Sequence, residues 1–138
     1  MLSAMAFDRS ATITVHLAAP PERVYAALTE ATALQEWYWP ASMAPKAFSH
    51  PVVGGGFGIA ADGAGFTGRY TELDSPRRIV QSWRWQGDDH DSRVTIDLTA
   101  AGGGTDLTVV HDQVDAETAE MYRQGWQSCL DRLPAYLS

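Results

Sequence analysis

Residues 115–137, with the sequence DAETAEMYRQGWQSCLDRLPAYL, are the stretch that decides the fold. Apolar side chains recur along it at steps of three and four residues, which places them on one face of a helix. They are Tyr122, Trp126, Cys129, Leu130, Leu133 and Leu137. Asp115 is a suitable N-cap residue, and Pro134 removes one helical hydrogen bond without ending the apolar spacing. The stretch therefore predicts a long closing helix whose apolar face the rest of the chain must cover.

Gly125 lies inside this predicted helix, where a glycine is less stable than an alanine by about 1 kcal/mol. Its place beside Trp126 predicts that the helix backbone comes close to a neighbouring element. We expect that neighbour to be a sheet.

The chain before the helix has the alternating pattern of β-strands, with apolar residues at every second position. The alternating segments are 11–17, a short one around Ala47, and those that contain Phe57, Phe66, Ile79, Val94 and Leu107. Turns rich in glycine, proline or aspartate separate most of them, so the segments predict an antiparallel meander. Its apolar face needs a cover, and only residues 115–137 are long enough to provide one.

Two short helices are expected between the first strand and the meander. Pro20 and Pro21 suit the first positions of a helix, since their missing N–H groups would be unpaired there in any case. Thr32 is a candidate cap for a second helix that Pro40 ends. Helices and an antiparallel sheet together indicate an α+β fold.

The composition is that of one folded domain, with 138 residues of which 45% are hydrophobic and 20% charged. We expect a flexible N-terminal arm at residues 1–10 and a single domain at residues 11–138. A net charge of −7 and a single lysine, Lys46, argue against nucleic-acid and anionic-membrane partners. The one cysteine excludes an internal disulfide, and no stretch looks like a membrane span or a secretory signal. The expected location is therefore the cytoplasm.

Short motifs along nearly the whole chain from Ala11 onward resemble those of a known superfamily. They are Ala19–Val24 with Ala27–Thr29, Trp37 with Pro40, Gly55–Gly56, Gly68 with Tyr70, Pro76–Trp83, Gly104–Thr108, Val110–His111 and Gly125–Trp126. This ordered set resembles the START-like, Bet v 1-like (SRPBCC) superfamily and, within it, the branch named after the activator of the Hsp90 ATPase. The resemblance implies a helix-grip fold of the order β-α-α-β(6)-α. In that fold a curved antiparallel sheet wraps around a long C-terminal helix, with a cavity between them.

The side chains expected to face the space between sheet and helix are mostly aromatic. These candidate ligand-binding residues are Trp37, Trp39, Phe57, Phe66, Tyr70, Gln81, Trp83, Trp85, His111, Tyr122 and Trp126. They could simply fill a core, but many bulky rings on a curving sheet also leave gaps, which is the usual setting of an apolar ligand site. His111, with Gln81 or Tyr122, could hold the polar end of a ligand.

No catalytic, metal or cofactor site is predicted. No serine stands in a nucleophile elbow, and no pair of carboxylates shares a covered face. Residues 88–91 (DDHD) lack the glycine and distal glutamate of a calcium loop and are expected to form a solvated hairpin tip. Cys129 is expected to be a buried, unreactive thiol on the helix.

The leading hypothesis is a non-enzymatic START-like domain that binds a small hydrophobic or aromatic molecule in the cavity. One alternative is an enzyme of the cyclase, dehydratase or hydrolase type that uses His111. A second is a protein-interaction module like the Hsp90 ATPase activator. That co-chaperone has a further N-terminal chaperone-binding domain, which this chain has no residues to form, so a chaperone partner is not expected. A homodimer is left open.

Overall fold

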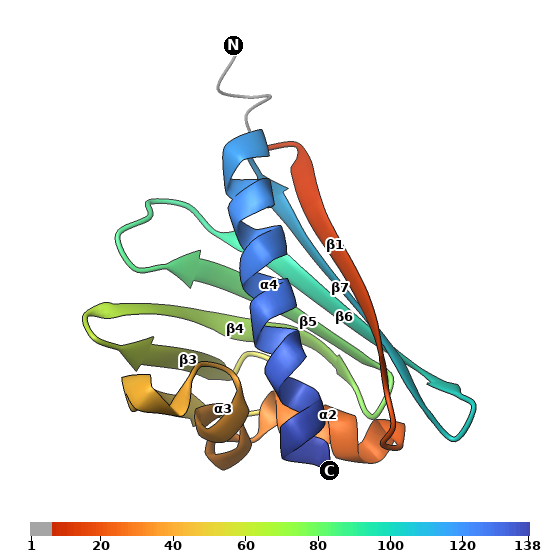
Figure 1. The fold of residues 1–138 in the computed structure, drawn as a ribbon. Coiled ribbons are helices and arrows are strands. Elements are labelled where there is room, and N and C mark those ends of the chain that lie inside the picture. Colours follow the sequence, from red (N-terminus) through yellow and green to blue (C-terminus); the bar gives the residue numbers. More distant parts are fainter. Residues whose placement is uncertain (1–6) are drawn as a thin grey trace.

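The alternating segments form a single seven-stranded antiparallel sheet in the computed structural model, which describes residues 7–138. The strands are β1 (Arg9–Leu17), β2 (Lys46–Ser49), β3 (Gly56–Ala61), β4 (Ala64–Asp74), β5 (Arg78–Trp85), β6 (Ser92–Ala101) and β7 (Gly104–Val114). Their order across the sheet is β1-β7-β6-β5-β4-β3-β2. The predicted meander thus runs in sequence from β2 to β7, and β1 pairs with β7 at the other edge (Figure 1).

The helices occur in the predicted order. They are α2 (Pro21–Thr29), α3 (Ala31–Trp37) and the long α4 (Ala116–Leu137), with a 3-10 turn, η1 (Ala41–Met43), after α3. Pro21 opens α2, and the Asp115 carboxylate caps α4 by accepting a 2.7 Å hydrogen bond from the backbone N–H of Thr118. The cap predicted at Thr32 is wrong, because α3 begins at Ala31 with Glu30 in the N-cap position, two residues earlier than a cap at Thr32 requires. The α+β helix-grip order β-α-α-β(6)-α is confirmed.

The N-terminal boundary differs from the prediction. β1 begins at Arg9, because the ladder to β7 already includes Arg9 and Ser10, two residues that were expected in the arm. Residues 1–6 of the predicted arm lie outside the described residues.

One face of the sheet is apolar and the other is polar. Leu107, Val109 and His111 of β7 point to the covered face and are fully buried. On the outer face, guanidinium–carboxylate pairs such as Arg93–Asp112 and Arg78–Asp97 join neighbouring strands. Full burial of one aliphatic side chain contributes roughly 1.5–3 kcal/mol, whereas exposed ion pairs contribute little, so the covered face holds the sheet to its helix.

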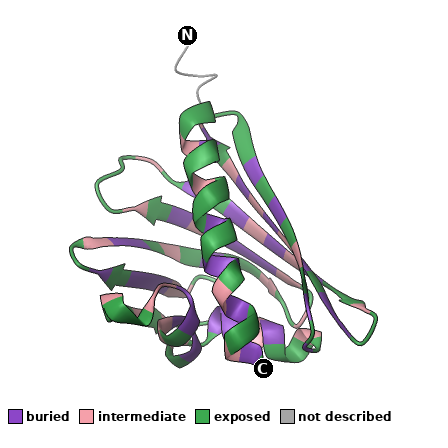
Figure 2. Cartoon of the chain, viewed as in Figure 1, coloured by how far each residue is buried: buried purple, intermediate pink, exposed green. Residues whose placement is uncertain are grey.

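α4 crosses the covered face of the sheet, with α2 and α3 near its C-terminal end (Figure 1). Its buried residues concentrate in the C-terminal half, from Trp126 to Leu137, whereas Ala119 is the one buried residue before them. The N-terminal half of α4 is largely exposed in Figure 2. The C-terminal half therefore anchors the helix, and space is left beneath the other half.

Candidate functional site

A cavity of about 360 Å³ lies between the middle of α4 and the sheet, open to solvent on one side. Its lining residues come from the end of α3, from β4, from β5 and the turn that follows it, and from α4. They are Tyr38, Trp39, Phe66, Trp83, Trp85, Asp88, Thr118, Met121, Tyr122, Gly125, Trp126 and Cys129. Four of the five tryptophans of the chain line this one space.

The floor of the cavity is a row of nearly parallel rings on β4 and β5. Phe66 stacks on Trp83 with 4.2 Å between ring centroids, and Trp85 lies 6.0 Å from Trp83, both at an interplanar angle of 21°. The strand period explains this row, because Trp83 and Trp85 point to the same face and Phe66 pairs with Trp85 across the ladder. Trp39 meets both Phe66 and Trp85 edge-on and closes one end.

The wall opposite the rings is one stripe of α4. Thr118, Tyr122, Gly125 and Cys129 follow each other at steps of three and four residues, so they share a helix face. Gly125 was predicted to allow a close backbone contact, and this is wrong. A Cβ atom at Gly125 would meet no atom within 4 Å, because the residue faces the open space of the cavity.

His111 lies behind this wall, fully buried, with both ring nitrogens hydrogen-bonded. The indole N–H of Trp126 donates to Nδ1 at 3.0 Å, and Nε2 lies 2.7 Å from the hydroxyl of Ser92. An indole N–H can only donate, so Nδ1 carries a lone pair and the ring proton sits on Nε2. Nε2–H therefore donates to the Ser92 hydroxyl, which in turn donates to the backbone carbonyl of Trp83 at 3.1 Å. Burial lowers the pKa of His111 to about 3, so the ring is neutral at physiological pH.

Tyr122 separates His111 from the cavity. Its ring stacks on the imidazole with 4.2 Å between centroids and an interplanar angle of 8°. Burial, and then the negative charges of Asp88 and Asp115, raise the pKa of Tyr122 to about 12. The phenol is therefore neutral, and no hydrogen bond joins its hydroxyl to another side chain in the described part of the protein.

The indole N–H of Trp83 is the one buried side-chain polar group without a hydrogen-bond partner among residues 7–138. A buried donor without an acceptor costs about 1–3 kcal/mol relative to a paired one. Trp83 also lines the cavity, so an indole N–H without an acceptor belongs to one of the lining residues.

The predicted candidate residues divide into two groups. Those that line the cavity are Trp39, Phe66, Trp83, Trp85, Tyr122 and Trp126, and those that do not are Trp37, Phe57, Tyr70, Gln81 and His111. The indole N–H of Trp37, 1% exposed, donates to the carbonyl of Ala27, and the Tyr70 hydroxyl is bonded to Ser49 at 2.7 Å. Phe57 and Gln81 line a much smaller void of about 20 Å³. The interior beneath α2 and α3 is therefore filled, and open space begins nearer the middle of α4.

The cavity is also lined by six residues that were not among the predicted candidates: Tyr38, Asp88, Thr118, Met121, Gly125 and Cys129. Helical spacing could have found the four on α4, because they lie three or four residues from Tyr122 or from one another. Tyr38 sits at the centre of the aromatic cluster and contacts the rings of both Phe66 and Trp126.

Arg132 of α4 holds this part of the lining in place. Its guanidinium donates to the backbone carbonyl of Tyr38 at 2.7 Å and to that of Trp37 at 3.3 Å. These carbonyls lie at the C-terminal end of α3, where no further helical turn can bond them. α3 and α4 are thereby joined beside the cavity.

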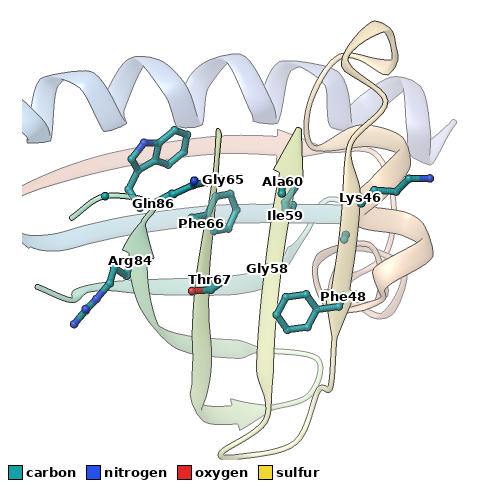
Figure 3. A pocket seen from close by; sticks show the side chains of 13 residues that line it. Lys46, Phe48, Gly58, Ile59, Ala60, Gly65, Phe66, Thr67, Arg84 and Gln86 are labelled. Atoms are coloured by element: carbon teal, nitrogen blue, oxygen red, sulfur yellow. The ribbon is translucent and has the colours of Figure 1, made fainter. Parts of the chain in front are cut away.

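A second hollow, of about 590 Å³, lies on the outer face of the sheet at the ends of β2 to β5 (Figure 3). Phe48, Gly58, Thr67 and Arg84 are neighbours in one row across these strands. The Phe48 ring, 53% exposed, lies over Gly58, where a Cβ atom would come within 2.7 Å of it. Arg84 is bonded to Asp91. Five of its thirteen lining residues are glycine or alanine, whereas the cavity under α4 brings four tryptophans together, so that cavity is the better candidate site.

Other kinds of site receive no support from residues 7–138. They contain no group of three or more His, Cys, Asp or Glu side chains that could hold a metal ion. Asp88, Asp89 and Asp91 are exposed in the turn between β5 and β6, as expected for a solvated tip. In this part of the chain, no helix has the length and apolar character needed to cross a membrane.

Residues 18–138 match the family model described as activator of Hsp90 ATPase homolog 1-like protein. Among solved structures, protein CV1439 from Chromobacterium violaceum is 30% identical with a TM-score of 0.82, over 93% of this chain and 96% of that one. An HSP90 activator from Plasmodium falciparum, PFC0360w, is 26% identical with a TM-score of 0.79, over 93% of this chain and 95% of that one. The Aha1 dimer from Colwellia psychrerythraea shares the fold at 18% identity, with a TM-score of 0.79 over 94% and 96% of the two chains. No curated protein sequence matches.

Proposed function

This chain belongs to the family of activator of Hsp90 ATPase homolog 1-like proteins, and we propose that it is a non-enzymatic domain that binds a small hydrophobic or aromatic molecule between its sheet and α4. The observation that carries the proposal is the cavity of about 360 Å³ with an aromatic floor. Small-molecule sites usually measure about 300–1,000 Å³ and are lined by apolar and aromatic side chains with a few polar groups. This cavity lies at the small end of that range.

The charge of the lining restricts the ligand further. Asp88 is the only charged residue among the lining residues, and none of them is basic. A bound carboxylate would lie near this negative charge with no cation to pair with, whereas an amine could also lie on the face of a tryptophan. Neutral and cationic aromatic molecules are therefore expected to bind better than aromatic acids.

The state of His111 favours binding over catalysis. A general base needs a free lone pair within reach of the substrate proton. The only lone pair of His111 accepts the indole N–H of Trp126, and Tyr122 stands between the imidazole and the cavity. If the protein were nevertheless an enzyme using His111, then His111→Ala would abolish turnover while the protein stayed folded.

A panel of neutral, cationic and anionic aromatic compounds tests the proposal. We expect binding to raise the melting temperature and to change the tryptophan fluorescence, because four of the five tryptophans line the cavity. Trp39→Ala should weaken the response, since this ring closes one end of the cavity. Phe48→Ala, which removes an exposed ring from the outer face, is the matched control and should leave the response unchanged. No response of the wild-type protein to any compound would contradict the proposal.

A protein-interaction role is the second candidate. It is favoured by the 26% identity to the Plasmodium falciparum HSP90 activator over nearly the whole of both chains. A pull-down with an Hsp90 homologue, followed by an ATPase assay, tests it, and absence of both binding and stimulation would exclude this role. Size-exclusion chromatography with light scattering tests the homodimer that the sequence leaves open.

A further inference from the structure

We propose that Gly125 determines the size limit of the cavity, and that the ligand is a flat aromatic molecule lying between the backbone of α4 at this residue and the row of rings on β4 and β5. This inference rests on the proposed function. To that function, the inference adds the shape of the ligand and names Gly125 as the residue that selects for this shape.

Gly125 lies in the cavity wall that α4 forms, on the solvent-exposed flank of the helix. On the stripe of α4 that faces the cavity, Met121 lies one helical turn before it and Cys129 one turn after it. Any side chain at position 125 would therefore project into the open space between these two. The missing side chain contributes directly to the width of the cavity.

The surrounding structure gives Gly125 no other reason to be glycine. A Cβ atom here would meet nothing within 4 Å, and the backbone does not adopt the positive φ that favours glycine. Gly68 on β4 shows the contrast, because a Cβ atom there would lie 1.9 Å from the backbone oxygen of Ser82. Packing requires glycine at position 68. At position 125, packing would also permit a larger residue.

Helix stability argues against glycine at this position. In a helix interior, glycine is less favourable than alanine because its backbone loses more conformational freedom on folding. Alanine would make this position more stable and has room there, yet the residue is a glycine at a place where a side chain would narrow the cavity. The geometry thus ties this residue to the cavity and not to the fold.

The opposite wall favours a flat ligand. Phe66, Trp83 and Trp85 present nearly parallel rings, at 21° to one another. Aromatic groups prefer offset-stacked or edge-to-face contacts with such rings. A planar molecule can make these contacts on one side and lie against the bare helix backbone on the other.

The first arm of the test measures stability without any ligand. Gly125→Ala should lower the equilibrium constant for unfolding about fivefold, which corresponds to the helix-propensity difference between the two residues. Urea denaturation followed by tryptophan fluorescence measures this change. A variant less stable than the wild type would overturn the inference, because it would mean that packing requires the glycine.

The second arm measures binding of N-phenyl-1-naphthylamine, a neutral aromatic fluorescent probe. Gly125→Leu should weaken its binding at least tenfold, because the leucine side chain would occupy the space of the probe. Gln127→Leu adds the same side chain on the opposite, exposed face of α4 and should leave binding unchanged. Thermal melts confirm that both variants are folded.

The outcomes separate the two proposals. If the wild-type protein binds the probe and Gly125→Leu binds it equally well, the role of Gly125 is refuted while the ligand-binding function stands. If the wild-type protein binds neither the probe nor any compound of the panel, the proposed function and this inference both fail. The stability of Gly125→Ala still reports in that case whether packing requires the glycine.

Discussion

The neutral, buried state of His111 predicts a defined loss of stability as the pH falls. Burial lowers the pKa of His111 to about 3, and in the unfolded chain the pKa returns to its ordinary value near 6.5. Between these values the unfolded state binds a proton that the folded state does not. Stability from this residue is therefore fully present above pH 6.5 and is lost progressively as the pH falls towards 3. The two pKa values give a loss of about 1.4 kcal/mol between pH 7.5 and pH 5.5.

The measurement compares the wild-type protein with His111→Gln across this pH range. The free energy of unfolding is obtained from urea titrations followed by tryptophan fluorescence. The isoelectric point near 4.8 makes pH 5.5 a practical lower limit, because low net charge promotes precipitation. Glutamine carries no titrating proton, so the variant lacks the contribution of residue 111. All other histidines and carboxylates occur in both proteins, and their contributions cancel in the difference.

The expected result is a difference between the two proteins that changes by about 1.4 kcal/mol from pH 7.5 to pH 5.5. A constant offset between them only reports how well glutamine fits, and it does not affect the slope. If the difference stays constant within about 0.5 kcal/mol, His111 accepts a proton in the folded protein without penalty. That result would refute the inference that His111 is buried and neutral, with its two ring nitrogens hydrogen-bonded to Trp126 and Ser92.

Three further predictions follow from the same structure. Trp126→Ala should lower the free energy of unfolding by about 3–5 kcal/mol, because it removes a buried ring and the donor to His111. Urea titration measures this loss, and a value below about 1 kcal/mol would mean that the ring is not packed. Asp115→Ala should cost about 1 kcal/mol through loss of the cap of α4, measured in the same way, and an unchanged value would contradict the capping contact. Cys129 should react with a thiol reagent only after unfolding, because the residue is 6% exposed and burial raises the pKa of its thiol to about 11. Rapid labelling of the native protein would show that the cavity admits the reagent to the sulfur.

The order of the elements could be predicted from the sequence because apolar and polar residues alternate within each strand. The same alternation placed His111 on the covered face, where it is fully buried, and left His16 on the exposed one. Such predictions need only the position of a residue within its own strand. The helix-grip arrangement followed because one apolar helix was available to cover one apolar face.

The site could be predicted only in part, since it depends on distances between elements. The sequence indicates that Trp37, Tyr70 and Trp85 face inward, but it cannot tell which part of the interior is filled and which is open. The hydrogen-bond partners of His111 come from β6 and α4. Its tautomer, and its separation from the cavity, could therefore be determined only from the structure. Gly125 was misinterpreted because a glycine inside a helix is compatible both with a close contact and with an open space.

The two hydrogen bonds of Arg132 also determine how an opening to the cavity could widen. They join the turn that carries Tyr38 and Trp39 to the helix that carries Met121 and Gly125. Among the described residues, no hydrogen bond joins the turn between β5 and β6 to α4. We therefore expect the hairpin that bears Asp88 to move more readily than the other two sides of the entrance, so that its motion governs how fast a ligand enters or leaves.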